Sequence, residues 1–198
     1  MRTAPLSLAL CLLASCAALA PAASMTALER QRLVAHLEMT ESWLVDELTG
    51  LSPAQLQFHS APDSWSILQV LDHLVVCEPI YWKNFHDAMQ APPSNAVSAG
   101  SDDSVLWYGI DRTSRGKVVA GEDASGKLRD VKTGLAAFHR LRAEMLRYAR
   151  ATKDDLRAHY VPRERSDAWQ WFLLISTHSQ RHILQIREIK TSPRFPRN

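Results

Sequence analysis

The sequence predicts an all-α fold, a four-helix bundle with a long crossover loop between its second and third helices. Four segments place apolar residues at the 3.6-residue spacing of an amphipathic helix. Between the second and the third lie residues 91–129, which are rich in Pro, Ser, Gly and Asp and have no sustained periodicity. Because connections within bundles are usually short, a stretch of this length indicates a crossover between parallel neighbouring helices.

The first predicted helix spans residues 26–48. Thr26 can cap its start, with Glu29 three residues later as in a capping box. Gly50 can adopt the left-handed conformation that commonly ends a helix. The predicted core face carries four leucines, Leu33, Leu37, Leu44 and Leu48.

The second predicted helix begins near Ser64 or Ser66 and ends near Gln90. Pro79 lies inside it and is expected to kink it, because proline removes a backbone hydrogen bond. In the crossover that follows, residues 105–110 are apolar enough that we expect them to cover one end of the bundle. The apolar stripe of the second helix comprises Ile67, Val70, Leu71, Leu74 and Val75.

The third predicted helix spans residues 131–151, and the fourth spans residues 167–190 with Ser166 as its expected cap. The fourth helix is mostly apolar on the face that should meet the core. That face comprises Trp171, Leu174, Ile175, His178, His182, Ile186 and Ile189.

The amino terminus has the layout of a secretory signal peptide. Arg2 precedes an apolar run from Leu6 to Leu13, and small residues follow. The run is too short for a stable transmembrane helix. We therefore expect an exported protein, with a leader at residues 1–22 and a four-helix bundle domain at residues 23–198.

Two processing sites compete in this leader. Residues 20–22, Ala-Pro-Ala, fit ordinary cleavage and a released periplasmic protein. Residues 13–16, Leu-Ala-Ser-Cys, resemble the lipobox of bacterial lipoproteins, which implies a lipidated Cys16 and a membrane-anchored protein. Either route leaves Cys77 as the free thiol of the mature chain, so we expect no intramolecular disulfide.

Composition and charge narrow the classes of partner. Apolar residues make up 46% of the chain and charged residues 22%, which are ordinary values for a globular domain. The formal net charge is +2, and no stripe of Lys and Arg interleaved with aromatic residues is present, so we expect no nucleic-acid partner. The sequence does not define the oligomeric state, and a homodimer is compatible with it.

Three histidines form the strongest candidate site. His178 and His182 are four residues apart, which places both imidazoles on one helix face, one turn apart. His73 lies between Val70 and Leu74 on the inward side of the second helix. Three imidazoles would leave coordination positions open, as in catalytic zinc sites, and would suit zinc, nickel, iron or copper. Histidines at this spacing also occur as ordinary core or surface residues, so spacing alone leaves both interpretations open.

Two stretches carry a family resemblance. Residues 65–74, Trp-Ser-Ile-Leu-Gln-Val-Leu-Asp-His-Leu, resemble the start of the second helix in the DinB-like superfamily. Residues 178–186 resemble the H-x-x-R-H-x-x-Q-I stretch of its last helix. The resemblance covers nearly all of the mature chain. It implies a right-handed bundle with a long crossover, and a divalent metal, usually zinc or nickel, held jointly by His73, His178 and His182.

Several neighbours of the histidines have more than one interpretation. Cys77 could be a fourth ligand or a small buried residue, and Glu78 could be a catalytic base or a surface carboxylate. Gln185 follows the family pattern and could support the metal site from outside. Arg181 is expected to form an ion pair, and Trp65 to pack at the entrance of the second helix.

The predicted function is metal-dependent hydrolysis or group transfer on an unknown small molecule. The family resemblance implies transfer or hydrolysis with low-molecular-weight thiols, but those thiols are mostly cytosolic, whereas the leader indicates export. The alternative is a non-enzymatic metal- or small-ligand-binding envelope protein, which a fourth protein ligand would favour. In a third interpretation the histidines have only a structural role.

Overall fold

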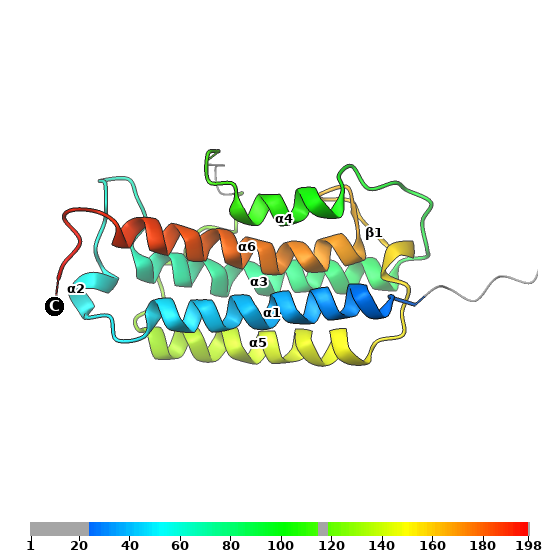
Figure 1. Ribbon diagram of the computed structural model, residues 1–198, viewed down its shortest axis with the longest axis horizontal. Helices are drawn as coiled ribbons and strands as arrows, with labels where there is room; N and C mark the ends of the chain where they lie inside the picture. Colours follow the sequence, from blue (N-terminus) through cyan, green and yellow to red (C-terminus); the bar gives the residue numbers. More distant parts are fainter. Residues whose placement is uncertain (1–23, 115–118, 198) are drawn as a thin grey trace, which may run out of the picture.

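The computed structural model, which describes residues 24–114 and 119–197, is the predicted all-α bundle (Figure 1). The predicted leader, including Cys16, lies outside the described residues. Each long helix begins and ends within a few residues of its predicted bounds. These helices are α1 (Ala27–Leu48), α3 (Ile67–Gln90), α5 (Val131–Ala151) and α6 (Ala168–Lys190).

Smaller elements occupy the connections. A short helix, α2 (Pro53–Leu56), follows α1, and a longer one, α4 (Asp102–Ile110), lies in the crossover. After α5 come a 3₁₀ turn (Leu156–Ala158) and two antiparallel strands, β1 (Tyr160–Val161) and β2 (Ser166–Asp167). Within the described ranges, every helix is too short or too polar to cross a lipid bilayer.

Local capping explains where the helices begin. The Thr26 side chain accepts from the Glu29 amide, and the Glu29 carboxylate accepts from the Thr26 amide at 2.8 Å, as the sequence predicted. A capping box of the same kind starts α3 at Ser66 rather than Ser64. Asp167, not Ser166, caps α6, because the Asp167 side chain accepts from the Gln170 amide.

The four long helices pack in a ring. Both α1 and α3 pack against α5 and α6, so α1 and α3 occupy opposite corners. The colour gradient in Figure 1 shows that α3 and α5 run in the same direction, opposite to α1 and α6. The chain must therefore return along the length of the bundle between α3 and α5, and α4 lies on that return path.

The expectation for residues 105–110 was wrong. They do not cover an end of the bundle but form most of α4, which lies along the flank of α6 (Figure 1). The two helices are close at Gly109, where an added Cβ would lie 3.1 Å from the carbonyl oxygen of Thr177. As a result α6 is covered by α1, α3 and α4, and most of its residues are buried.

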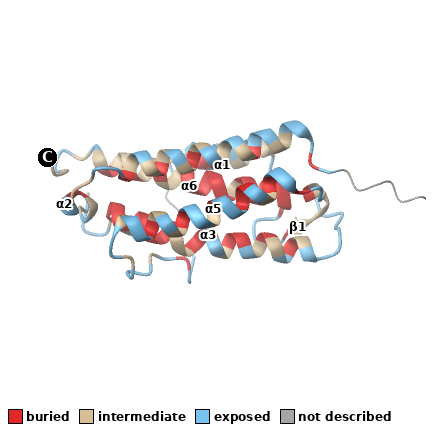
Figure 2. Cartoon of the chain, turned by 90° about the horizontal axis from the view of Figure 1, so that it is seen from below, coloured by how far each residue is buried: buried red, intermediate tan, exposed pale blue. Residues whose placement is uncertain are grey.

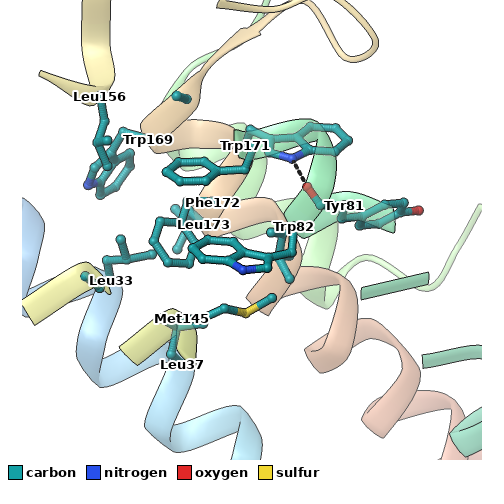
Figure 3. Packing of buried hydrophobic residues seen from close by; sticks show 14 of the residues in the cluster. Leu33, Leu37, Tyr81, Trp82, Met145, Leu156, Trp169, Trp171, Phe172 and Leu173 are labelled. Carbon is teal, nitrogen blue, oxygen red and sulfur yellow. Dashed lines mark hydrogen bonds between the residues drawn. The ribbon is translucent and has the colours of Figure 1, made fainter. Parts of the chain in front are cut away.

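The apolar core holds these helices in register. Figure 3 shows Trp171 and Phe172 of α6 packed with Trp82 of α3 and Met145 of α5. Each such side chain contributes roughly 1.5–3 kcal/mol when fully buried. Buried residues lie between the helices and exposed ones along their outer sides (Figure 2). Tyr81 belongs to the same cluster, with its ring 5.3 Å from that of Trp171 between centroids, and it also lines a cavity described below.

Candidate metal centre

The structure brings the three predicted histidines together. His73 comes from α3, and His178 and His182 come from α6. One ring nitrogen of each lies within 4.8 Å of the other two. The Nε2 atom of His178 is 3.3 Å from that of His73 and 3.1 Å from that of His182. Because α3 and α6 pack side by side, residues distant in sequence direct three nitrogens at one point.

The outer nitrogens of two rings determine where their protons lie. His73 Nδ1 donates to the main-chain carbonyl of Glu122 at 2.6 Å, and His182 Nδ1 donates to Oε1 of Gln185 at 2.8 Å. A carbonyl oxygen only accepts, so both Nδ1 atoms carry the proton of the neutral ring. The lone pairs of both rings are therefore on Nε2, the atom that faces the other histidines. Such outer bonds are usual for histidine ligands of metals.

This arrangement lacks protons at its centre. Of the three converging Nε2 atoms, only that of His178 can supply one, and a single proton cannot satisfy both neighbouring lone pairs. Nδ1 of His178 is buried without a hydrogen-bond partner among the described residues. A bound cation would satisfy all three Nε2 lone pairs at once. The donor set therefore fits a divalent metal ion.

The surroundings keep the rings in their neutral, metal-binding form. Burial lowers the pKa of His178 well below its usual range, and the nearby His182 and His73 lower it further. Burial and the neighbouring His73 lower the pKa of His182 to about 3. The pKa of His73 is also lowered by burial, although the Glu122 carbonyl opposes the shift. At neutral pH all three imidazoles can donate a lone pair.

A cavity of about 620 Å³ opens beside the histidines. Trp65, Tyr81 and Tyr108 form aromatic walls around it. Trp65 was expected only to pack at the start of α3, but its ring lies 4.8 Å from that of His73 and 6.2 Å from that of His182, measured between centroids. Three protein ligands beside an open cavity leave room for a small molecule to approach the ion.

The placement of Glu78 argues against its predicted role as a catalytic base. It does not line the cavity, and its carboxylate is fully buried between α3, α5 and α6. There it accepts from Arg142 at 2.8 Å and from the hydroxyl of Ser179. A carboxylate held in such an ion pair, away from the cavity, cannot take a proton from a substrate there.

Cys77 lies beside His73 but outside the group of converging nitrogens. Its Sγ atom is 3.4 Å from His73 Nδ1, the nitrogen that faces away from the site, and donates to the Glu122 carbonyl at 3.1 Å. Burial raises the pKa of this thiol to about 12 in the metal-free fold, and among the described residues only the three histidines bring their ligand atoms within 4.8 Å of one another. The structure gives no support to Cys77 as a fourth ligand.

Two predicted neighbours act through other contacts. Gln185 bonds His182, as described above, and so supports the site from outside. Arg181 forms no ion pair with any of the described residues, contrary to the expectation. Its guanidinium donates to the main-chain carbonyls of Tyr108, at 3.0 Å, and of Asp111 and Ser114. Arg181 therefore fastens the carboxyl end of α4 to α6 at the mouth of the cavity.

Sequence reasoning missed Glu122, Tyr81 and Arg163. The Glu122 carboxylate accepts from the Tyr81 hydroxyl at 3.1 Å and from the Arg163 guanidinium, and all three residues line the cavity. Tyr81 follows His73 by eight residues, about two helical turns, so its position on the same face was a usable signal. Glu122 lies in the aperiodic stretch, where no spacing rule applies.

Comparison with known proteins identifies the family. The sequence profile of the DinB superfamily matches residues 29–186, which include all three histidines. The chain belongs to the DinB superfamily. Its relatives include the uncharacterized protein YuaE of Bacillus subtilis (strain 168), 27% identical over an alignment of 161 residues that covers 76% of this chain and 91% of YuaE.

A solved structure shares the fold of this DinB superfamily protein. YfiT from Bacillus subtilis, described as a probable metal-dependent hydrolase with an unusual four-helix bundle topology, superposes with a TM-score of 0.57. The match covers 87% of this chain and 91% of YfiT at 18% sequence identity. At that identity the likeness shows a common fold.

Proposed function

We propose that this protein is a divalent-metal-dependent hydrolase or group transferase that acts on a small molecule in the 620 Å³ cavity. The observation that carries the proposal is the convergence of three Nε2 atoms, two of them with their lone pairs fixed toward the centre, beside an open cavity. The description of YfiT as a probable metal-dependent hydrolase supports the same reaction class. A bound zinc or nickel ion, or alternatively iron or copper, would supply Lewis acidity.

The protein's own residues would bind and orient the substrate. Trp65 and Tyr108 offer aromatic surfaces that can cover an apolar part of it and exclude water. The Tyr81 hydroxyl lies at the cavity wall and donates its one proton to the Glu122 carboxylate, so its oxygen can accept a hydrogen bond from a substrate. The absence of Cys77 and Glu78 from the converging group favours catalysis over a closed carrier site, because a fourth ligand would block approach.

A screen for metal-dependent turnover tests this proposal. The purified protein is stripped with a chelator, reloaded with zinc or nickel, and assayed on ester, amide and phosphoester substrates and on thiol acceptors. We expect activity that disappears on stripping, returns on reloading, and is lost in His178→Ala. The control is His139→Ala, an exposed histidine that pairs with Glu41. A protein that binds metal yet turns over none of these classes would favour the non-enzymatic binding protein instead.

We also propose that the protein is exported, on the basis of the leader at residues 1–22. Expression of the full chain in a bacterium and intact-mass measurement of the product test this directly. Cleavage after Ala22 gives a chain that begins at Ala23, whereas a lipoprotein begins at an acylated Cys16 and partitions into detergent. A product that retains residues 1–22 would contradict export.

A further inference from the structure

We propose that residues 119–126, called here the Glu122 segment, form a clamp that positions His73 for metal binding. Glu122 is its central positioning residue, and Asp72, Tyr81 and Arg163 are its anchors. The inference rests on the proposed function, because it concerns the affinity of the same site. It goes further by assigning to part of the long crossover a direct role in metal affinity.

The first link is the bond between Glu122 and His73. The main-chain carbonyl of Glu122 accepts from His73 Nδ1 at 2.6 Å and from Cys77 Sγ at 3.1 Å. The ring of a histidine can turn about its side-chain bonds, so this carbonyl fixes which nitrogen faces His178 and His182. A main-chain atom can do this only if its segment is held in place.

The second link is the anchoring of the Glu122 side chain. The Glu122 side chain is 6% exposed, and its carboxylate accepts from Tyr81 on α3 and from Arg163 after β1. The Arg163 guanidinium also lies over the ring of Tyr81, 5.2 Å from its centroid. A buried carboxylate with these two partners resists displacement, because leaving either partner would strand a desolvated charge.

The third link is Asp72, the residue directly before His73. Asp72 is buried, and its carboxylate accepts from the Ser125 hydroxyl at 2.8 Å and from the Gly126 amide at 2.6 Å. Gly126 has a φ of +67°, a conformation that favours glycine and lets its amide reach Asp72. The segment is thus fastened to α3 on both sides of the Glu122 carbonyl, at positions 72 and 81.

These links couple the segment to the metal. When the Glu122 segment is docked on α3, the His73 ring is already oriented, so an ion meets three Nε2 atoms that all face the binding position. When an anchor is lost, the Glu122 carbonyl can shift and part of the binding free energy must restore the His73 orientation. Loss of such an outer partner typically lowers metal affinity roughly 10- to 100-fold.

Zinc affinity of anchor variants tests the clamp. The dissociation constant of the full chain is measured by competition with a chromogenic chelator for wild type, Asp72→Ala and Arg163→Met. Both variants should bind roughly 10- to 100-fold more weakly. Matched controls are Asp111→Ala and Arg112→Met, which line the same cavity but bond Thr113 and Glu188 instead. The controls should bind as wild type does.

Hydrogen exchange provides a readout that a merely structural role would not change. Zinc should slow exchange of the amides in residues 119–126 in wild type but not in His73→Ala. If Asp72→Ala does not fold, Asp72→Asn retains one acceptor oxygen and should show a smaller loss of affinity. Wild-type zinc affinity in both anchor variants, or exchange of the segment that zinc does not alter, would overturn the clamp alone. Absence of zinc binding by wild type would overturn the proposed function together with it.

Discussion

Single residues in the interior of this bundle depend strongly on their partners. Glu78 on α3 and Arg142 on α5 are 1% and 0% exposed and pair at 2.8 Å, with the Ser179 hydroxyl of α6 bonded to both. The pair ties three helices together close to the site. Its sequence neighbour Cys77 stays on the His73 side of α3, whereas Glu78, five residues after His73, lies roughly 140° around the helix. This geometry explains why a carboxylate so near a ligand in sequence is not part of the cavity.

Loss of Arg142 should therefore destabilise the fold severely. Arg142→Met leaves the buried Glu78 charge without its cation, and we expect the free energy of unfolding to fall by about 3–5 kcal/mol. The control is Arg150→Met, which breaks the exposed pair with Glu38 and should cost about 0–1 kcal/mol. Urea unfolding monitored by circular dichroism measures both. Equal losses of unfolding free energy in Arg142→Met and Arg150→Met would contradict the buried ion pair between Arg142 and Glu78.

The depressed histidine pKa values make metal-free stability depend on pH. Below the usual pKa of about 6.5, the unfolded chain takes up protons that His73, His178 and His182 in the fold do not bind. Stability should therefore fall as pH drops below 6.5, until the folded pKa is reached, which is about 3 for His182. Urea unfolding in a chelator at pH 5 and pH 6 should show a slope that is smaller by roughly 1 kcal/mol per pH unit in His182→Gln. Identical slopes would contradict the pKa shift.

At the scale of elements, the 3.6-residue periodicity predicted the four long helices that enclose the core. It missed α4, which packs on the outer side of α6. The four long helices have apolar stripes, and capping residues such as Thr26 and Ser66 mark their starts. The helix α4 has no such stripe, because Leu106, Trp107 and Ile110 face solvent while Gly109 makes its close contact with α6. A helix that packs through a glycine has no 3.6-residue apolar stripe in its sequence, so periodicity does not predict it.

The close contact of α4 gives a sharp test. Gly109→Val would place methyl groups against the main chain of Thr177, so we expect a loss of about 1–3 kcal/mol from overpacking. Trp107→Val puts the same residue on the outer side of α4, where the side chain is 62% exposed, and should change stability by less than about 0.5 kcal/mol. Thermal unfolding of both variants measures these two changes in stability. A tolerated Gly109→Val would mean that α4 does not sit against α6 as described.

For the candidate site, spacing placed His178 and His182 together, the inward face of the second helix added His73, and the family resemblance joined the three. Neither spacing nor resemblance could supply the bond from His73 to the Glu122 carbonyl or the bond from the Gly126 amide to Asp72, because both join α3 to the crossover through main-chain atoms. Such contacts have no repeat in the sequence. They become visible only when α3 and the crossover are placed side by side.

At the scale of the whole molecule, the bundle brings α3 and α6 into contact and buries most of the histidine site that lies between them. Helix α6 packs against α1, α3 and α4, and most of its residues are buried, so two of the three ligands stand on a helix enclosed by its neighbours. The third stands on α3, where the clamp holds it. A rigid support of this kind keeps ligand geometry within the tolerance that metal binding requires.

The central claim is that three histidines bind one divalent ion, and calorimetric titration of the metal-free protein with zinc tests it most directly. Wild type should bind one zinc per chain, and His139→Ala should do the same. Most of the zinc affinity should be lost in each of His73→Ala, His178→Ala and His182→Ala, because only two imidazole ligands remain in each variant. A wild type that takes up no zinc, or a variant lacking all three histidines that binds as well as wild type, would contradict the account.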